Sequence, residues 1–544
     1  MLIGGRAGEG LNRAGQIIAR LLNAHGYHIY MYYDYPSLIR GGHNFSIIRA
    51  ATHSIGAHRT HVDVLLALNR ETLILHSGRL REGGAIIYDS DAAKADGIGI
   101  PLSKILKEEG APPITRNSGL IGAFARAAGI QWEVLERIIK KEFPKGTEIN
   151  LKVARRGFDA SEQKLRIDRP SMKGLPLVSG NEAIGLGLLR GGLTSYIAYP
   201  MTPTSSLLHF LAEVEGDFGL KVVHPENEIA VMLMAIGAAC GGEKVAVGTS
   251  GGGFCLMTEG LGFAGMAECP VVIVLGQRTG PSTGLPTYTS QGDLLFARHA
   301  SQGEFSRLVT APADASEAFF WSSESLRLAW RFQIPAIILS DKTLSEGYYS
   351  LMVHSREQSS VEESGPGNED RPYRRYRFTD SGVSPMAKMP TRGAVVKVNS
   401  YYHDEDGITT EDAAMTASMQ EKLLRKGEAL SKELGKYETV WTHGRGEDLA
   451  LVCWGSNGPV CQETADILGA RVVRPIVLHP FPEEAFGRAL GSPAATVVVE
   501  QNATAQLSSI LKGFGHRVDA TVLKYDGRPF SVEELATRVQ EVHA

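Results

Sequence analysis

One stretch of the sequence decides the fold class, and it runs Val271-Val272-Ile273-Val274-Leu275-Gly276-Gln277-Arg278-Thr279-Gly280-Pro281-Ser282-Thr283-Gly284-Leu285-Pro286-Thr287. Its short apolar start, followed at once by a loop of glycine and hydroxyl residues, is typical of a buried strand that ends at the edge of a sheet. Similar apolar runs recur along the chain and alternate with helical patterns, which indicates parallel sheets covered by helices. We therefore expect an α/β fold.

The alternation also divides the chain. A length of 544 residues predicts about three domains at roughly 100–200 residues each. We expect α/β domains at 1–160, 175–350 and 441–544. Between them, 351–440 is rich in Ser, Glu, Arg, Pro and Gly, which favours an extended linker over a separate domain; only 414–434 has a helical pattern. The strands expected are 45–49, 62–68, 85–88, 195–199, 245–248, 271–275, 336–340, 449–454, 471–478 and 496–500.

Composition argues against several classes of protein. The hydrophobic fraction of 43% and charged fraction of 21% are ordinary for globular proteins. A formal net charge of −4, without a long run of one sign, argues against a general nucleic-acid binder. We expect no transmembrane helix, because no apolar run reaches ~18 residues. The start of the chain, 1–10, has no signal-peptide pattern, so the cytoplasm is the expected location.

The cysteines indicate neither a metal site nor a disulfide framework. Their number is odd and no two form a C-x-x-C pair, which argues against structural zinc and favours buried, reduced thiols. Their spacing also matches no common iron–sulfur pattern, so a cluster for electron transfer would have to lie on another chain. The five are Cys240, Cys255, Cys269, Cys453 and Cys461.

Two glycine-containing motifs lie near the start of the chain. The cluster Gly4–Gly10 precedes a helical pattern, where free backbone N–H groups and the helix dipole could face a phosphate. It is not a G-x-G-x-x-G fingerprint, and a tight strand-to-helix turn is the alternative. The run Arg40-Gly41-Gly42-His43-Asn44 could present a cation to a phosphate or to a partner chain, or could simply be a loop.

A proline-rich turn follows the strand expected at 195–199. The run Tyr199-Pro200-Met201-Thr202-Pro203-Thr204-Ser205-Ser206 leaves the strand and enters a helix that Thr or Ser can cap. Open α/β sheets bind ligands at the carboxyl ends of their strands. Because prolines on both sides stiffen the turn, we expect the Thr202 hydroxyl to be held in place for binding rather than for capping alone.

Two acidic residues stand where the next helix begins. The run Glu226-Asn227-Glu228 lies between a strand ending at His224 and an apolar helical run through Cys240. The helix dipole alone favours acids in a first turn. The apolar helix is nevertheless expected to be buried, and a carboxyl group there can share a proton with a heterocycle nitrogen.

The loop at 276–294 is the strongest candidate for binding. Its Arg278 offers a planar fork suited to a carboxylate, amid several hydroxyl groups that could orient a polar ligand. A purely structural loop rarely combines these features at a strand end. The hydroxyl residues are Thr279, Ser282, Thr283 and Thr287, and the loop continues to Gln291-Gly292-Asp293-Leu294.

Taken together, these motifs resemble those of the 2-oxoacid:ferredoxin oxidoreductases. The run 199–203 resembles that family's Y-P-I-T-P motif, with Met201 in place of Ile, and 276–287 resembles its G-x-R-x-G-P-S-T-G-x-P-T segment. The clusters at 4–10 and 40–42 resemble the gamma module, here fused ahead of alpha as in the 2-oxoglutarate and broad-range branch. The runs Cys453-Trp454-Gly455-Ser456 and His479-Pro480-Phe481-Pro482 resemble the last domain of the alpha module.

The resemblance implies an alpha subunit that oxidatively decarboxylates a 2-oxoacid, with 2-oxoglutarate favoured, giving acyl-CoA, carbon dioxide and reduced ferredoxin. Its fold would include a pyrimidine-binding domain for thiamine diphosphate and a transketolase C-terminal-like domain. Coenzyme A would be the co-substrate, bound with help from the gamma module. A beta subunit would carry magnesium and the iron–sulfur cluster, in an (αβ)2 assembly. The chain has no G-D-G with paired Asn, the usual diphosphate–metal signature, which fits this division.

The resemblance also implies roles for single residues. Glu228 would bond the aminopyrimidine ring of thiamine diphosphate and activate the cofactor. Thr202, Arg278 and Thr287 would position the carboxylate of the 2-oxoacid, with Tyr199 and Pro200 beside the cofactor. Two other readings stay open: a non-oxidative decarboxylase or transketolase-like enzyme, and a nucleotide-binding regulatory protein built around 4–10.

Overall fold

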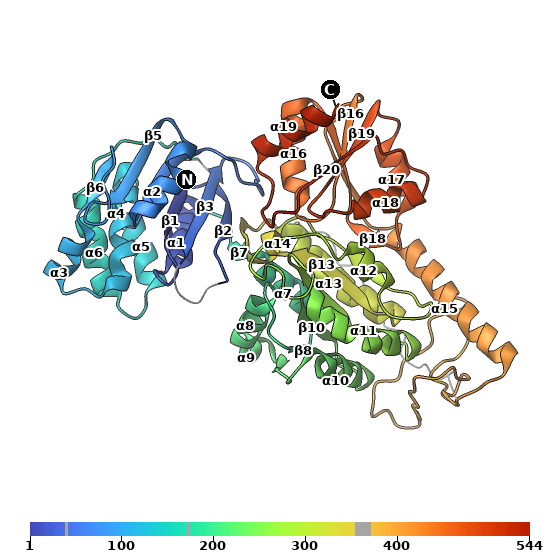
Figure 1. Cartoon of the computed structure of the whole chain (residues 1–544). Helices are drawn as coiled ribbons and strands as arrows, with labels where there is room; N and C mark the ends of the chain where they lie inside the picture. Colours follow the sequence, from blue (N-terminus) through green and yellow to red (C-terminus); the bar gives the residue numbers. More distant parts are fainter. Residues whose placement is uncertain (38–41, 171–173, 354–371, 544) are drawn as a thin grey trace. The chain divides into compact units, whose positions relative to one another are not determined.

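The computed structural model describes residues 1–37, 42–170, 174–353 and 372–543. Strands in these ranges form three sheets, and helices cover them, as the α/β class predicts (Figure 1). Contacts group the chain into two compact units. Unit 1 comprises Met1–Ser179, Glu346–Met352 and Phe530–Leu535, and unit 2 comprises Gly180–Ser345, Val353–Pro529 and Ala536–Ala544. The domain boundaries drawn from the sequence stay a prediction.

Unit 1 is built on a mixed sheet of eight strands in the order β6-β5-β4-β1-β3-β2-β14-β7. Strands β1, β4, β5 and β6 are parallel, whereas β3, β2, β14 and β7 continue the sheet in antiparallel pairs. The strands are β1 (Leu2–Arg6), β2 (His28–Asp34), β3 (His43–Ala51), β4 (Val62–Ala67), β5 (Leu80–Asp89), β6 (Ile98–Ile100), β7 (Leu177–Ser179) and β14 (Tyr348–Ser350). The helices are α1 (Leu11–Ala24), α2 (Arg70–His76), α3 (Leu102–Glu109), α4 (Arg116–Ala127), α5 (Trp132–Glu142) and α6 (Thr147–Asp159).

Unit 2 holds a seven-stranded sheet in the order β18-β12-β13-β11-β10-β8-β9, parallel except for β18. Every residue of β10, β11 and β13 is buried, because helices shield both faces, and this explains the continuous apolar runs. The strands are β8 (Ser195–Ala198), β9 (Lys221–Val223), β10 (Val245–Thr249), β11 (Val272–Gln277), β12 (Leu308–Thr310), β13 (Ala336–Asp341) and β18 (Val477–His479).

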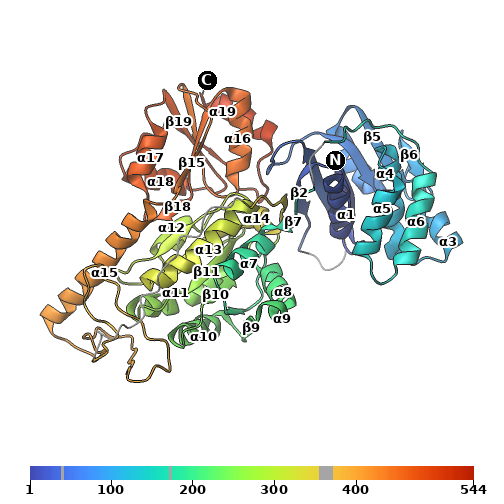
Figure 2. The same ribbon diagram turned by 180° about the vertical axis from the view of Figure 1, so that it is seen from behind.

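Helices of this part pack in pairs, α10 against α11 and α7 against α13. Figure 2 shows them around β10 and β11 from behind. Their bounds are α7 (Gly180–Arg190), α8 (Ser205–Glu213), α9 (Glu215–Phe218), α10 (Glu228–Cys240), α11 (Gly251–Met266), α12 (Leu294–His299), α13 (Ala315–Phe332) and α14 (Lys342–Glu346). Among the residues that the structure describes, no helix is both long and apolar enough to cross a membrane.

The rest of unit 2 contains a five-stranded sheet in the order β15-β17-β16-β19-β20. Its strands are β15 (Val440–His443), β16 (Leu449–Val452), β17 (Arg471–Pro475), β19 (Ala495–Glu500) and β20 (Ala520–Leu523). Its helices are α16 (Asn457–Leu468), α17 (Glu483–Leu490), α18 (Gln506–Gly513) and α19 (Val532–His543). The helix expected at 414–434 is α15 (Ala413–Leu434), and 372–412 has neither helix nor extended strand.

The strands expected from the sequence are present, with one correction. The run 471–478 is not one strand, because β17 and β18 belong to different sheets. The break has a local cause: the carbonyl oxygen of Thr439 accepts hydrogen bonds from the backbone N–H groups of both Ile476 and Val477. The chain turns there, and His479 pairs with Val309 of β12.

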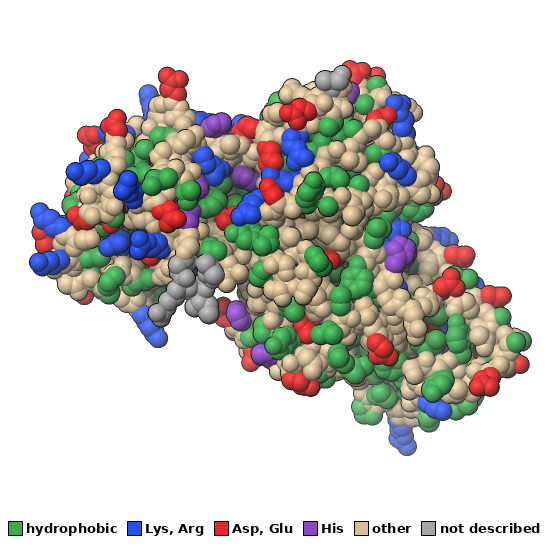
Figure 3. Space-filling model, viewed as in Figure 1, with side chains coloured by type: hydrophobic (Ala, Val, Ile, Leu, Met, Phe, Trp, Pro, Cys, Tyr) green, Lys and Arg blue, Asp and Glu red, His purple; other side chains and the backbone are tan. Residues whose placement is uncertain are grey.

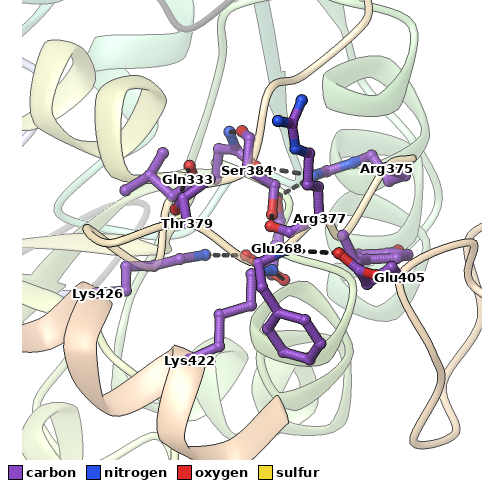
Figure 4. Close-up of polar contacts among 12 residues, drawn as sticks. Glu268, Gln333, Arg375, Arg377, Thr379, Ser384, Glu405, Lys422 and Lys426 are labelled. Carbon is purple, nitrogen blue, oxygen red and sulfur yellow. Dashed lines mark hydrogen bonds and ion pairs between the residues drawn. The ribbon is translucent and has the colours of Figure 1, made fainter. Parts of the chain in front are cut away.

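A buried ionic cluster fastens α15 to the end of α11 (Figure 4). The Glu268 side chain is 2% exposed, and its carboxylate accepts hydrogen bonds from Lys422 Nζ, at 2.5 Å, and from Lys426 Nζ. Arg375 Nη2 donates to the backbone oxygen of Glu268 at 2.8 Å. Burial alone would raise the pKa of Glu268, but Lys422, Lys426 and Arg375 hold that pKa well below its ordinary range. The cluster therefore depends on one carboxylate that compensates two buried ammonium groups.

We expect Glu268→Gln to lower the free energy of unfolding by about 3–5 kcal/mol, because it leaves Lys422 and Lys426 buried without a counter-charge. Denaturant unfolding of the variant and the wild type measures the difference. Glu421→Gln is the matched control on α15, since its pair with Arg425 is exposed at the surface and should contribute little. Equal losses in the two variants would contradict a stabilising role for the cluster.

Candidate active site

Three loops of unit 2 meet because three strands share a direction. Strands β8, β10 and β11 are parallel neighbours, so the residues after them lie along one edge of the sheet. These loops contain the Thr202 turn, the glycine run Gly251–Gly253 and the Arg278 loop. Glu228 follows β9, which pairs in parallel with β8 on the far side. The sheet topology thus brings the predicted site residues to the same edge.

A buried side-chain amide, that of Asn181, supports the Thr202 turn. Asn181, which is 0% exposed, donates from Nδ2 to Pro203 O at 2.8 Å and to Ser206 Oγ at 2.7 Å. Thr204, rather than Thr202, bonds inside the turn, through Oγ1 to Met201 O at 2.9 Å. Neither Thr202 nor the N-cap residue Thr204 makes a side-chain cap to α8 in the described structure, and a binding role for the Thr202 hydroxyl stays a prediction. Asn181 was missed from the sequence, because nothing local marks a helix-borne amide as the support of a turn whose Pro203 is 22 residues away.

Arg278 and Thr202 are in direct contact. Arg278 Nη1 donates to the backbone oxygen of Thr202 at 3.0 Å, which fixes the guanidinium over the turn. Burial lowers the pKa of Arg278, although its side chain remains partly exposed. With one N–H used by the carbonyl of Thr202, the remaining donors of the planar fork are available to a ligand carboxylate.

Glu228 is a buried carboxylate with an unused oxygen. Its side chain is 4% exposed, and its Oε1 has no hydrogen-bond partner among the residues that the structure describes. Asn227 caps α10 by accepting the Ala230 N–H at 2.9 Å, so the helix start does not need Glu228. Glu226, two residues earlier, is exposed. A buried polar atom without a partner costs free energy, so Glu228 Oε1 is prepared for a donor that the chain itself does not supply.

The glycine run at the start of α11 lets the helix backbone pass close to Glu228. A Cβ at Gly253 would lie 2.5 Å from Glu228 Oε1, and one at Gly251 would lie 2.8 Å from Asp293 Oδ2. A Cβ at Gly252 would reach only Ser282 O, at 4.0 Å. Because none of the three positions has a side chain, the backbone at the start of α11 can approach both Glu228 and Asp293.

The remaining predicted residues differ in exposure. Thr287 is 6% exposed and its Oγ1 is buried without a partner, so it resembles Glu228 in being an unused polar group. Tyr199 is 37% exposed and its ring lies 5.9 Å from that of His224, and Pro200 is also exposed. No hydrogen bond of the described residues joins Tyr199 or Pro200 to Glu228.

A buried glutamine ties this loop to the five-stranded sheet. Gln291 is 0% exposed; its Nε2 donates to Trp454 O at 2.9 Å, and its Oε1 accepts from Asn457 Nδ2 at 2.7 Å and from Gln501 N at 3.1 Å. The next acid, Asp293, is partly buried, and burial raises its pKa to about 6. No role for Asp293 could be predicted from the sequence, because its burial comes from parts of the chain that are distant in sequence.

The glycine cluster of unit 1 forms a turn ahead of α1. Gly8 and Gly10 have φ values of 88° and 73°, and Asn117 Nδ2 donates to Glu9 O. Of the run predicted to present a cation, Arg40 and Gly41 lie outside the described residues. Within that run, His43 is described, and its Nε2 lies 2.8 Å from Nε2 of His76.

The cysteines are free, as expected, and the expected burial holds for three of them, is incomplete for Cys240 and is wrong for Cys255. Cys269, Cys453 and Cys461 are buried, whereas Cys255 is exposed and Cys240 is intermediate. Cys255 lies on α11 next to Leu256, which is also exposed. Within the described ranges, no group of three or more His, Cys, Asp or Glu side chains could hold a metal ion.

Comparison with known proteins agrees with this geometry. The family model described as "Pyruvate flavodoxin/ferredoxin oxidoreductase, thiamine diP-bdg" matches residues 187–422, and "Pyruvate ferredoxin/flavodoxin oxidoreductase" matches 1–160. The alpha subunit of 2-oxoacid:ferredoxin oxidoreductase 2 of Aeropyrum pernix is 29% identical, with 100% of this chain and 97% of that protein covered. The 2-oxoglutarate synthase subunit KorA of Archaeoglobus fulgidus is 33% identical over 60% of this chain and 88% of its own length.

A solved structure extends the match to the whole chain. The 2-oxoglutarate:ferredoxin oxidoreductase of Magnetococcus marinus, determined with 2-oxoglutarate, coenzyme A and succinyl-CoA bound, superposes with a TM-score of 0.91 at 28% identity, covering 100% of this chain and 99% of that one. The fold and the family match together define the chain as an α/β protein with a thiamine-diphosphate-binding segment. More particularly, the chain belongs to the 2-oxoacid:ferredoxin oxidoreductase family, as an alpha subunit that includes the gamma-type segment at its start.

Asp293 gives a prediction about pH. Its folded pKa of about 6 lies above the unfolded value, so the folded state holds the proton more tightly, and wild-type stability falls as the pH rises from about 4 through 6. Asp293→Asn cannot ionise, and we expect it to be more stable than the wild type at pH 8 by about 2–3 kcal/mol.

Denaturant unfolding at pH 8 and at pH 4 checks this expectation, because the advantage of Asp293→Asn should vanish in acid. Asp217→Asn, at an exposed position on α9, is the control and should show no such dependence. An advantage of equal size at both pH values would mean that ionisation of Asp293 is not its cause.

Proposed function

We propose that the chain is the alpha subunit of an enzyme that oxidatively decarboxylates a 2-oxoacid with coenzyme A, giving acyl-CoA, carbon dioxide and reduced ferredoxin. The observation that carries the proposal is the buried, unpartnered carboxylate of Glu228 beside Gly253, on the sheet edge that also holds Arg278. Similarity over the whole chain to a 2-oxoglutarate:ferredoxin oxidoreductase supports 2-oxoglutarate as the substrate.

The residues around Glu228 fit the aminopyrimidine of thiamine diphosphate. The unused Oε1 supplies the acceptor that a ring nitrogen needs, and Gly252 borders open space at the start of α11, where a Cβ would meet no atom nearer than 4.0 Å. When bound, thiamine diphosphate supplies the carbon nucleophile and the electron sink for loss of carbon dioxide. Glu228 holds the proton that is exchanged with the ring nitrogen, at Oε1.

Substrate binding is assigned to the Arg278 side of the site. The guanidinium, already fixed on the Thr202 carbonyl, offers its remaining donors to the carboxylate next to the 2-oxo group. The Thr287 hydroxyl, buried and unpartnered, is a second polar contact for the ligand. A charged fork binds a carboxylate more strongly than a hydroxyl does, so Arg278 is the main anchor and Thr287 an orienting contact.

We also propose that a beta subunit completes the site, carrying magnesium, the diphosphate contacts and the iron–sulfur cluster that reduces ferredoxin, in an (αβ)2 assembly. Hydrophobic side chains lie on the face of unit 2 that carries α11 (Figure 3). On α10 and α11, large apolar side chains next to the candidate site are 44–50% exposed, as in a surface that a partner covers. They are Ile229, Leu233, Met234 and Leu256.

The whole proposal is tested by assembly. The chain purified alone should contain no stoichiometric iron and should reduce no dye with any 2-oxoacid. Co-expression with a beta subunit of the family should give an iron-containing complex that turns over 2-oxoglutarate, measured by dye reduction with a panel of 2-oxoacids. Stoichiometric iron or substantial turnover by the isolated chain would refute the shared site.

Glu228→Gln should slow activation of the cofactor by about 10²–10⁴-fold, the scale for removing one acid–base group. The amide of Gln can accept a hydrogen bond but cannot exchange the proton. The measurement is solvent exchange of the hydrogen on the thiazolium carbon in the assembled enzyme, without substrate. Glu226→Gln is the matched control, because Glu226 is exposed, and it should exchange at the wild-type rate. Normal exchange in Glu228→Gln would show that another group activates the cofactor.

A further inference from the structure

A cavity on the opposite edge of the seven-stranded sheet gathers basic side chains. Its volume is about 400 Å³, within the usual range for small-molecule sites. Arg298 and His299 end α12, Arg307 precedes β12, and His479 ends β18, so four basic residues line one cavity. Labels α12, β18 and the upper end of α15 lie close together in both ribbon views (Figures 1 and 2).

This cavity is separate from the candidate active site. The active-site loops follow the carboxyl ends of β8, β10 and β11, whereas Arg307 stands at the amino end of β12, which runs parallel to β13. The two sites therefore belong to opposite edges of the sheet.

Arg298 has no structural partner. Its Nε and Nη1 are buried and make no hydrogen bond, and the described residues offer it no ion pair. The usual task of a basic side chain at this position, binding the last carbonyls of the helix, is done by Arg307 Nη1, which donates to Ala300 O at 2.7 Å and Ala297 O at 3.4 Å. The side chain is half-buried as a whole, but two buried guanidinium nitrogens without a hydrogen bond among the described residues cost free energy, so they need a reason outside those contacts.

The titratable groups around Arg298 also favour a partner from outside the chain. Burial, together with Arg298, Arg307 and His299, lowers the pKa of His479 to about 3. Among the groups that shift Arg298, Arg307 and His479, none is a carboxylate. Glu304 also lines the cavity, but its side chain is exposed. The positive charge in the cavity therefore comes from Arg298 and Arg307, and Glu304 is the one acid among the described residues that line it.

We propose that this cavity binds the phosphate group of a small molecule. Two guanidinium groups and two imidazoles converge on it, and guanidinium forks match the several oxygen atoms of a phosphate. A neighbouring cavity of about 750 Å³ shares Glu304, Phe305 and Gln420 with it and is also lined by Phe263 and Tyr402. The molecule that carries the phosphate can therefore be larger than the free ion, and an aromatic group has rings to stack on.

The test measures binding of inorganic phosphate and of ADP to the full chain by calorimetry, with chloride at equal ionic strength as the blank. Arg298→Gln removes the unpaired charge and keeps most of the volume, and it should weaken binding at least tenfold. Arg488→Gln, at an exposed position on α17, is the matched control and should bind like the wild type.

Thermal unfolding gives a second readout that does not depend on turnover of 2-oxoacids. Because Arg298 makes no bond in the fold, Arg298→Gln should unfold at the wild-type temperature or higher without phosphate, and should lose the rise in temperature that phosphate gives the wild type.

The two probes distinguish the source of the phosphate. ADP binding that Arg298→Gln weakens identifies a nucleotide, and weakening of inorganic phosphate alone identifies the free ion; either result supports the site. The proposal is overturned when Arg298→Gln binds both probes as tightly as the wild type, or when the wild type binds neither at millimolar concentration. Neither result bears on the proposed 2-oxoacid chemistry, which is read by dye reduction.

Discussion

The approach of Glu228 to the first turn of α11 is the constraint on which the candidate site depends. The carboxylate and the backbone at Gly253 are closer than any side chain would permit, since even a Cβ would lie 2.5 Å from Oε1. The same turn passes Asp293 at Gly251. One run of three residues without side chains therefore sets how deeply α10, α11 and the 276–294 loop can pack together, and what shape of ligand fits between them.

Glutamine side chains hold that arrangement in place. Gln291 fixes the end of the loop by bonding three backbone or amide groups of the five-stranded-sheet part, while Gln277, at the end of β11, accepts the Asp293 N–H at 3.0 Å. The loop is thus anchored at both ends of its functional section, and Arg278 is anchored on Thr202. Groups that bind a ligand on a scaffold of this kind need little reorganisation, which lowers the entropic cost of binding.

Sequence patterns were informative where burial leaves a local trace. Strands such as β11 and β13 are buried on both faces, so their apolar runs could be read directly. The turn at 199–206 and the Arg278 loop could likewise be predicted as strand-end loops, whereas the contact between them depends on the order of strands in the sheet. The support of the turn by Asn181 left no such trace.

Long-range partners were the largest omission, for a physical reason. Lys422 and Lys426 are four residues apart on α15, a spacing that on most helices marks a solvated face. Here that face is buried, because both lysines bond the carboxylate of Glu268. The same is true of β14, whose three residues complete the sheet of unit 1 by pairing with β2 and β7 at both sides.

The Glu268 cluster also sets an order of events during synthesis. Glu268 and Lys422 are 154 residues apart, so at about 5–20 residues per second a ribosome makes the carboxylate roughly 8–30 s before the first ammonium group that neutralises it. During that interval the end of α11 carries an acid that resists burial. The seven-stranded part of unit 2 can therefore close fully over Glu268 only after α15 has left the ribosome, which makes completion of this core a late step of biosynthesis.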